Sequence, residues 1–229
     1  MIAAMGLEEP RVAAVLGELH QASKRDKWVF LRAAPAVLLA RLKGVPIMTG
    51  INPYLGDAYI GVPPEVGRLL YLTARAINAK KVVEFGTSFG ISALYLAAAM
   101  RDNGGHFIGS ETEANKIAVA RENLDRARLS ACSEVRAGDA LETFQDLAGP
   151  VDLVLLDGWK DLYLPMLKLL TPKLRKGSVM IADNIFTFKT GLAPYVAHMQ
   201  NSANGFRSTT LTLGEGIEYS VFENGGGSE

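Results

Sequence analysis

The chain has 229 residues, 48% hydrophobic and 21% charged, a composition that excludes an intrinsically disordered protein. Its 24 basic residues balance 24 acidic ones, which argues against nucleic acid as the main partner because phosphate binding needs a basic surface. The single cysteine, Cys132, cannot form an internal disulfide, and no apolar run is long enough to cross a membrane. We therefore expect a cytoplasmic protein without membrane segments.

The first part of the chain is predicted to be a helical extension. Residues 7–22 place apolar side chains on one face, and residues 26–42 form a second predicted helix that Pro35 interrupts. An ordered Gly/Pro-rich loop follows, from Gly44 to Pro64. We expect one domain, with the extension and loop at 1–58, the catalytic core at 59–222 and a frayed tail at 223–229. The extension is expected to cover the active site, to pair with another subunit, or both.

The stretch KVVEFGTSFGISALYL, residues 81–96, predicts a strand, a glycine turn and a helix. Its pattern is E-x-G-x-x-x-G around Gly86 and Gly90, not the G-x-G-x-x-G that binds a dinucleotide pyrophosphate. Glu84, at the end of the strand, would repel a phosphate and attract an amine. A ligand with an ammonium, a sulfonium and an adenosine fits better, and S-adenosylmethionine is the obvious candidate. A purely structural turn remains the alternative.

Strands and helices alternate regularly after this turn. Such repeats predict an α/β fold with a doubly wound, mostly parallel sheet. The last section is β-rich, with Gly214 and Gly216 between two strands, and predicts an antiparallel hairpin that closes the edge of a seven-stranded sheet. The strands are expected at 81–85, 106–110, 134–137, 151–156, 178–182, 206–213 and 218–222, and helices at 64–78, 113–128, 139–147 and 160–175.

Two acidic residues follow the next two strands. Glu111 ends the second strand, where a carboxylate accepts hydrogen bonds from both ribose hydroxyls, or it is only an acid at a helix start. We favour the ribose role, because ligands of open α/β sheets bind at the carboxyl ends of the strands. Asp139 follows the third strand and could accept from an adenine amino group while the backbone of Ala140 meets the ring. It could equally be a helix N-cap, or serve both purposes.

The segment from Val151 to Asn184 carries the strongest signal. VDLVLLDGWKD places Asp157 at the end of the fourth strand, and GSVMIADN places Asp183 and Asn184 at the end of the fifth. Two carboxylates and an amide are hard oxygen ligands that suit Mg²⁺. Lys160, three residues after Asp157, is either a solvated surface lysine or a partly neutral base beside the cation. The metal set favours the base.

The stretch LDGWKDLYLP…LRKGSVMIADN resembles the corresponding part of catechol O-methyltransferase and its bacterial relatives, in the cation-dependent small-molecule O-methyltransferase family. The resemblance extends from about Tyr59 to Phe222. EFGTSFGIS is similar to that family's cofactor loop and IGSETE to its ribose-binding strand. The resemblance implies a class I methyltransferase fold of Rossmann-like type. It also implies an O-methyltransferase that uses S-adenosylmethionine, acts on a small phenolic substrate and forms a homodimer.

The resemblance also implies roles for individual residues. Lys160 would be the catalytic base, Trp159 would pack on the adenine, and the substrate would be a vicinal-dihydroxy aromatic such as a catechol. Phe186 and Phe188, with Trp28 or Tyr54, are expected to wall the apolar acceptor pocket. Mg²⁺ would be held by Asp157, Asp183 and Asn184. Contacts to S-adenosylmethionine would come from Val62, Glu84, Gly86, Thr87, Ser88, Ser92, Glu111, Asp139, Ala140, Asp157 and Trp159.

Two positions depart from the mammalian members of that family. Gly158 stands in the D-x-W-K motif where they have a histidine. RSTTLTLGEG offers no carboxylate near Thr209, where they have a glutamate that binds the second catechol hydroxyl.

Two other functions fit parts of the sequence, and a third is disfavoured. A methyltransferase that needs no metal would use Asp183 and Asn184 only to satisfy loop backbone. A noncatalytic S-adenosylmethionine-binding or dimeric interaction module would need neither Lys160 nor Asp157, yet both are present. An NAD-dependent oxidoreductase is disfavoured by the missing G-x-G-x-x-G.

Overall fold

The computed structural model describes residues 6–25 and 61–223. The predicted helix at 26–42, nearly all of the predicted loop up to Pro64, and the tail from residue 224 lie outside the described residues, as do Trp28 and Tyr54. Within the two described ranges, no helix combines the length and the apolar character that a membrane crossing requires.

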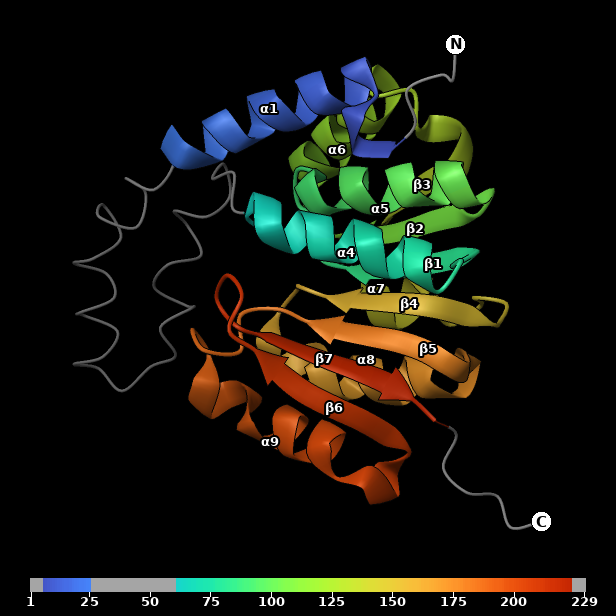
Figure 1. Ribbon diagram of the computed structural model, residues 1–229, viewed down its shortest axis with the longest axis vertical. Helices are drawn as coiled ribbons and strands as arrows, with labels where there is room; N and C mark the ends of the chain where they lie inside the picture. Colours follow the sequence, from blue (N-terminus) through green and yellow to red (C-terminus); the bar gives the residue numbers. More distant parts are fainter. Residues whose placement is uncertain (1–5, 26–60, 224–229) are drawn as a thin grey trace.

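Seven strands form one mixed sheet in the order β3-β2-β1-β4-β5-β7-β6 (Figure 1). The first five run parallel, and β7 and β6 are antiparallel to their neighbours, as the sequence predicted. The order reverses between β1 and β4, so the carboxyl ends of these two strands flank the point where open α/β sheets bind ligands. The strands are β1 (Lys81–Phe85), β2 (His106–Glu111), β3 (Ser133–Ala137), β4 (Val151–Leu156), β5 (Leu174–Ala182), β6 (Phe206–Leu211) and β7 (Ile217–Phe222).

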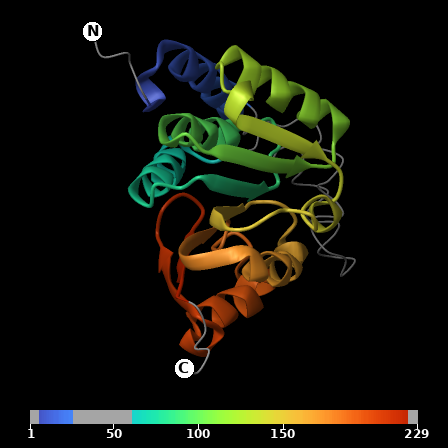
Figure 2. The same ribbon diagram turned by 90° about the vertical axis from the view of Figure 1, so that its right-hand side faces the viewer.

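Helices lie on both faces of the sheet (Figure 2), and the buried apolar side chains form two clusters that match these layers. One cluster joins the sheet to α1 (Pro10–Arg25), α4 (Pro64–Ala76), α5 (Ile91–Asn103) and α6 (Ala114–Arg126). The other joins it to α7 (Ala140–Thr143), α8 (Tyr163–Leu170) and α9 (Lys189–Gln200). The doubly wound α/β fold is therefore confirmed.

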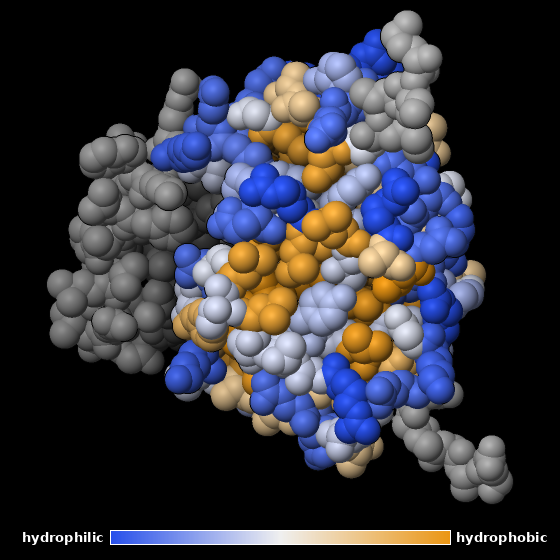
Figure 3. Space-filling model, viewed as in Figure 1, coloured by the Kyte–Doolittle hydropathy of each residue, from blue (hydrophilic) through white to orange (hydrophobic). Residues whose placement is uncertain are grey.

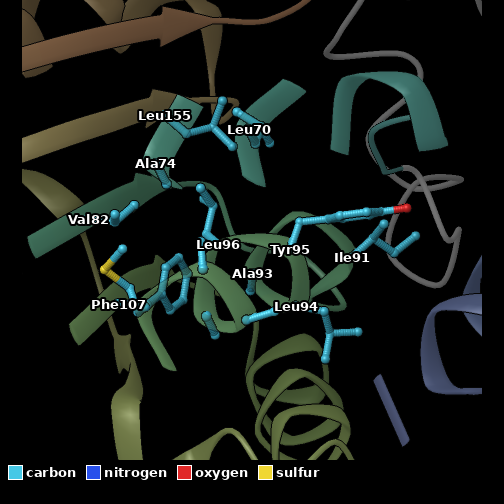
Figure 4. Packing of buried hydrophobic residues seen from close by; sticks show 14 of the residues in the cluster. Leu70, Ala74, Val82, Ile91, Ala93, Leu94, Tyr95, Leu96, Phe107 and Leu155 are labelled. Carbon is cyan, nitrogen blue, oxygen red and sulfur yellow. The ribbon is translucent and has the colours of Figure 1, made fainter. Parts of the chain in front are cut away.

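Helix α5 is the most deeply buried helix of the first layer, with every residue from 91 to 100 buried. Leu96 and Ala93 pack among side chains from the sheet and from α4, such as Val82 and Leu70 (Figure 4). Helix α4 packs closely against α5 because Gly67 has no side chain. A Cβ on Gly67 would lie 2.3 Å from the ring of Tyr95. This packing fixes the start of α5, and with it the glycine turn that precedes the helix.

The described helices cover the sheet unevenly. On the face seen in Figure 1, β4, β5 and β7 lie in front with no described helix over them. Apolar residues gather in the middle of the same face (Figure 3), and Leu72 on neighbouring α4 leaves 61% of its surface exposed. The layer formed by α1, α4, α5 and α6 therefore belongs mainly to the β3-β2-β1 half of the sheet.

Three helices differ from the prediction: two are shorter than expected and one was not predicted. The helix expected at 160–175 is a short α8 between two 3-10 helices, and β5 begins at Leu174, because Pro172 cannot continue an α-helix. The helix expected at 139–147 is only the single turn of α7. Helix α9 was not predicted, since Gly191 and Pro194 are typical helix breakers, yet Leu192 and Tyr195 bury its inner face.

Candidate active site

The glycine turn after β1 lies directly against the segment after β4. Gly86 has φ +92°, and a Cβ there would lie 2.6 Å from the Cα and N of Gly158. Its N–H and that of Thr87 both donate to the carbonyl of Ser110, at 3.1 Å. Because only glycine permits this conformation and approach, the turn brings two backbone segments together at the switch point. Gly86 is thus placed at the predicted edge of the sheet.

Glu84 is completely buried below this turn, and neither oxygen of its carboxylate has a hydrogen-bond partner among the described residues. Burial raises the pKa of Glu84 to about 8, the negative charges of Asp157 and Glu111 raise it further, and the nearby hydroxyls of Ser92 and Thr87 oppose the rise. The Thr87 hydroxyl is also buried without a partner among those residues. Unsatisfied buried oxygens are costly, so this group of acceptors fits a ligand that brings donors, such as an ammonium.

Glu111 is held at the end of β2 by backbone donors. Its Oε1 accepts from the N–H groups of Thr112 and Glu113 at 2.7 and 3.0 Å, and its Oε2 accepts from Ser88 at 2.9 Å. Ser88 belongs to the glycine turn and has φ +49°, so one carboxylate ties the turn to the next strand. A carboxylate oxygen accepts two hydrogen bonds, so Oε2 has a lone pair that no residue of the ranges 6–25 and 61–223 uses.

The remaining predicted cofactor residues take different positions. Asp139 is an exposed N-cap whose Oδ1 accepts from Leu141 at 2.8 Å, which is the structural role foreseen for it. Ala140 beside it is buried. Trp159 leaves 39% of its surface exposed, so part of its surface is open to a flat ligand. The side chain of Val62 packs in the hydrophobic core, so a contact with a ligand would have to come from its backbone. The ligand roles of all four stay predictions.

Asp157 and Asp183 follow paired residues on neighbouring strands, Leu156 of β4 and Ala182 of β5. Burial raises the pKa of both carboxyl groups. The pKa of Asp183 reaches about 7, because the charge of Asp157 adds to burial. One buried and one partly buried carboxylate therefore lie close enough for one charge to disfavour the other, and a bound cation would relieve this cost.

Asn184 completes the predicted metal set, with a left-handed backbone at φ +65° and its N–H donating to Asp183 Oδ1 at 2.6 Å. Within residues 6–25 and 61–223, no three His, Cys, Asp or Glu side chains gather closely enough to hold a metal. The predicted set contains two acids and one amide, so it is a weaker set of protein ligands than such a cluster. A metal on these residues stays a prediction.

Lys160 turns back to the predicted metal residues. Its Nζ lies 3.3 Å from Asp157 Oδ1 and donates to the Tyr163 hydroxyl at 2.9 Å. The amine also lies 5.1 and 5.6 Å from the ring centroids of Tyr163 and Phe188, and the lysine side chain is only 15% exposed. Lys160 is therefore not a solvated surface lysine, which was the alternative interpretation.

Sequence reasoning missed two residues at this end of the sheet. Tyr163 was passed over because a tyrosine in a helical apolar pattern is typical of a core; its place three residues after Lys160 was the available signal. Glu215 lies in the β6–β7 turn, not near Thr209, and its Oε2 accepts from Thr187 at 2.7 Å. The turn is fixed to the segment after Asn184, since Phe186 N–H donates to the carbonyl of Glu215 at 2.9 Å. Glu215 is near enough to contribute to the raised pKa of Asp183.

Comparison with known proteins finds similar methyltransferases. Residues 83–185 match the family described as "Methyltransferase domain". A curated catechol O-methyltransferase from Niastella koreensis is 34% identical over 134 residues, which are 57% of this chain and 60% of that protein. The resemblance to catechol O-methyltransferases predicted from the sequence is thereby confirmed.

Solved structures agree with this similarity. Cofactor-bound Rv0187 from MTB is 28% identical and superposes with a TM-score of 0.68, covering 83% of this chain and 97% of its own. The O-methyltransferase from Bacillus cereus in complex with SAH shares the fold, with a TM-score of 0.65 at 21% identity over 90% of this chain and all of its own. The chain spans about 60% of the length of the first curated relatives that it matches.

Proposed function

We propose that this chain, whose residues 83–185 match the methyltransferase-domain family, transfers a methyl group from S-adenosylmethionine to a hydroxyl of a catechol-like small molecule, with the help of Mg²⁺. The observation that carries the proposal is the meeting of three groups at the switch point of the sheet. These are the buried acceptors around Glu84, the carboxylate pair of Asp157 and Asp183, and the inward-turned amine of Lys160.

The donor set around the glycine turn supports S-adenosylmethionine. Glu84 and Thr87 offer buried acceptors to the methionine ammonium, and Glu111 keeps a free lone pair for the ribose. Trp159 presents an exposed ring on which adenine can stack. The SAH in the Bacillus cereus O-methyltransferase and the cofactor in Rv0187 favour the same ligand in a shared fold. When bound, S-adenosylmethionine supplies an electrophilic methyl group on a sulfonium.

The acids after β4 and β5 support Mg²⁺. Two carboxylates with raised pKa values and the amide of Asn184 would supply oxygen ligands, which Mg²⁺ prefers, and a vicinal diol could supply further oxygens. When bound, the ion lowers the pKa of a hydroxyl that it contacts. The residues then have different roles, since Asp157, Asp183 and Asn184 hold the cation, whereas Lys160 accepts the hydroxyl proton at Nζ.

The acceptor would lie between Lys160 and the segment that follows β5. Phe188 flanks the amine, and Phe186 leaves 48% of its surface exposed beside the β6–β7 turn. These rings suit a flat aromatic acceptor. The carboxylate of Glu215 could bind its second hydroxyl, in place of the glutamate missing near Thr209.

Labelled S-adenosylmethionine and a panel of catechols, caffeoyl-type phenols and flavonoids test the proposal, each with Mg²⁺ and with excess chelator. We expect transfer to vicinal diols only, and its loss with chelator. Asp157→Ala should abolish metal-dependent turnover. Methylation of a catechol by this variant in excess chelator would reject the metal role and favour the metal-independent methyltransferase. Binding without turnover on every acceptor would favour a noncatalytic S-adenosylmethionine-binding module.

A homodimer and a cytoplasmic location are part of the same proposal, and both rest on the resemblance and the composition. Sedimentation of the full chain tests the dimer, which predicts a mass close to twice the 24.6 kDa of one chain. A sedimenting species of one chain mass at micromolar concentration would contradict it.

A further inference from the structure

We infer that Tyr163 is a positioning residue that directs the amine of Lys160 toward the acceptor. The inference rests on the proposed function, because it gives Tyr163 a role within the same site. Tyr163 begins α8, is fully buried, and lies at the point where the ends of β4 and β5 meet.

The Tyr163 hydroxyl is surrounded by three polar partners. It donates to the carbonyl of Leu156 at 2.8 Å and lies 3.2 Å from the carbonyl of Asp183. Leu156 immediately precedes Asp157, so both carbonyls belong to the backbone that carries the predicted metal ligands. The third partner is Lys160 Nζ at 2.9 Å.

Counting donors fixes the direction of these bonds. A tyrosine hydroxyl has one hydrogen, and two backbone carbonyls can only accept. The hydrogen is therefore committed to the carbonyls, and a lone pair of the hydroxyl must receive an N–H from Lys160. The fully buried ring cannot turn away, because Phe85 and Tyr195 pack against it edge-on, with centroids 6.5 and 5.5 Å from its own.

These hydrogen bonds determine how the amine of Lys160 is oriented. Beside the bond to its carbon stem, the Lys160 nitrogen has three directions in which it can make contacts. The Tyr163 hydroxyl takes one at 2.9 Å, and Asp157 Oδ1 takes another at 3.3 Å. The third direction points away from both partners, and it is the direction left for the acceptor hydroxyl. Without the tyrosine oxygen, the flexible four-carbon stem would leave the orientation of the amine unset.

A double-mutant cycle tests this role. Tyr163→Phe keeps the ring and removes only the oxygen, and Lys160→Met removes the amine. With a catechol, S-adenosylmethionine and Mg²⁺, we expect Tyr163→Phe to lower kcat about 10- to 100-fold with little change in the KM for S-adenosylmethionine. In the Lys160→Met background, single-turnover rates should show no further loss. An equal loss in both backgrounds, or a change in KM alone, would overturn the inference.

Tyr195→Phe is the matched control. Tyr195 is equally buried and packs edge-on against Tyr163, but its hydroxyl has no hydrogen-bond partner among the described residues. The substitution removes the same atom from the same cluster without touching Lys160. It should leave kcat within about twofold of the wild type. A kcat as low as that of Tyr163→Phe would assign the effect to core packing and overturn the inference.

A measurement without turnover separates this inference from the proposed function. The urea unfolding midpoints of Tyr163→Phe, Lys160→Met and the double variant should be non-additive, because the hydroxyl and the amine contact each other. Should the wild type methylate no acceptor while the midpoints remain coupled, the proposed function fails and the contact stands. Additive midpoints together with a normal kcat in Tyr163→Phe would reject the inference and leave the function intact.

Discussion

Gly86 and Gly158 meet backbone to backbone at the switch point of the sheet. A Cβ on Gly86 would lie 2.6 Å from Gly158, and a Cβ on Gly158 would lie 2.5 Å from the ring of Phe85. Phe85 thus occupies the space into which a side chain at 158 would begin. This packing gives a physical reason why Gly158 stands where mammalian catechol O-methyltransferases have a histidine.

Gly86→Ala should therefore destabilise the protein and weaken S-adenosylmethionine binding. The residue would have to adopt φ +92° while its Cβ meets backbone, so we expect a loss of about 2–4 kcal/mol in the free energy of unfolding. Urea unfolding and calorimetric titration measure the two effects. Gly191→Ala in α9 is the control, since its Cβ meets nothing within 4 Å and should stabilise by up to about 1 kcal/mol. Equal stability of the two variants would contradict the tight contact.

Glu84→Gln should change how stability depends on pH. The pKa of Glu84 is about 8 in the folded protein and 4.5 in a model peptide, so between these values the folded state keeps a proton that the unfolded chain loses. Glu84 by itself should then make the free energy of unfolding of the ligand-free wild type fall as pH rises through this window, by about 1.4 kcal/mol per pH unit. Glu84→Gln should remove this contribution and leave the slope that Asp183 adds below about pH 7, and it should stabilise the ligand-free protein at pH 7 and weaken S-adenosylmethionine binding.

Unfolding titrations from pH 5 to 8 provide the measurement. Glu142→Gln, whose side chain is exposed on α7, is the matched control and should keep the slope of the wild type. A Glu84→Gln variant with an unchanged slope would show that the buried carboxylate does not hold its proton in the folded state.

Much of the fold could be predicted because its signals are local. The β-branched run before Gly86, the regular alternation of βα units and the glycines between the last two strands each determine a nearby element. Helix α9 was missed because Pro194 and Gly191 are unfavourable locally, whereas burial of Leu192 and Tyr195 is a tertiary effect. The early end of α8 has a local cause in Pro172, which the predicted helix ran past.

Positions in the site could be predicted better than contacts. The carboxyl ends of parallel strands lie at one edge, so Glu84, Glu111, Asp157 and Asp183 were assigned to one rim from their places in the chain. The partners of these groups depend on rotamers and loop paths. Sequence alone therefore did not reveal that the Tyr163 hydroxyl accepts a hydrogen bond from Lys160, or that the β6–β7 turn brings Glu215 to the segment after β5.

Asp183→Asn should separate metal binding from folding. In the absence of metal, Asp157 and Asp183 raise each other's cost of ionisation, so loss of one charge should leave the metal-free protein as stable as the wild type or more so. Mg²⁺ at about 100 times its Kd should stabilise the wild type by about 2.7 kcal/mol and the variant hardly at all. Thermal unfolding with Mg²⁺ and with chelator measures both effects.

Asp146→Asn is the control for this experiment, because that carboxylate is exposed and pairs only with Arg136 among the described residues. It should keep the full Mg²⁺ response. If the Tm of the wild-type protein does not change with Mg²⁺, the proposed role of the ion is wrong.

Glu218→Ala should destabilise the protein although Glu218 is far along the chain from the proposed chemistry. The carboxylate is fully buried in β7 and accepts from Ser208 Oγ at 2.5 Å, from Gln200 Nε2 at 3.0 Å and from the Thr210 hydroxyl. These donors come from β6 and α9, so one acid joins the hairpin to the helix. Its loss removes the acceptor that the three donors share. Ser208 and Gln200 keep other partners in Ser220 and Thr210, whereas the Thr210 hydroxyl loses its acceptor, so we expect about 1–3 kcal/mol of destabilisation in urea unfolding.

Glu223→Ala provides the comparison, since Glu223 is exposed and pairs with Arg207 at 2.8 Å, a contact worth less than about 1 kcal/mol. Because the hairpin carries Glu215 to the proposed acceptor site, Glu218→Ala should also raise the KM for the acceptor more than the KM for S-adenosylmethionine. Similar small losses of stability in the two variants would mean that water satisfies the donors around Glu218, and that the hairpin keeps its place without the buried acid.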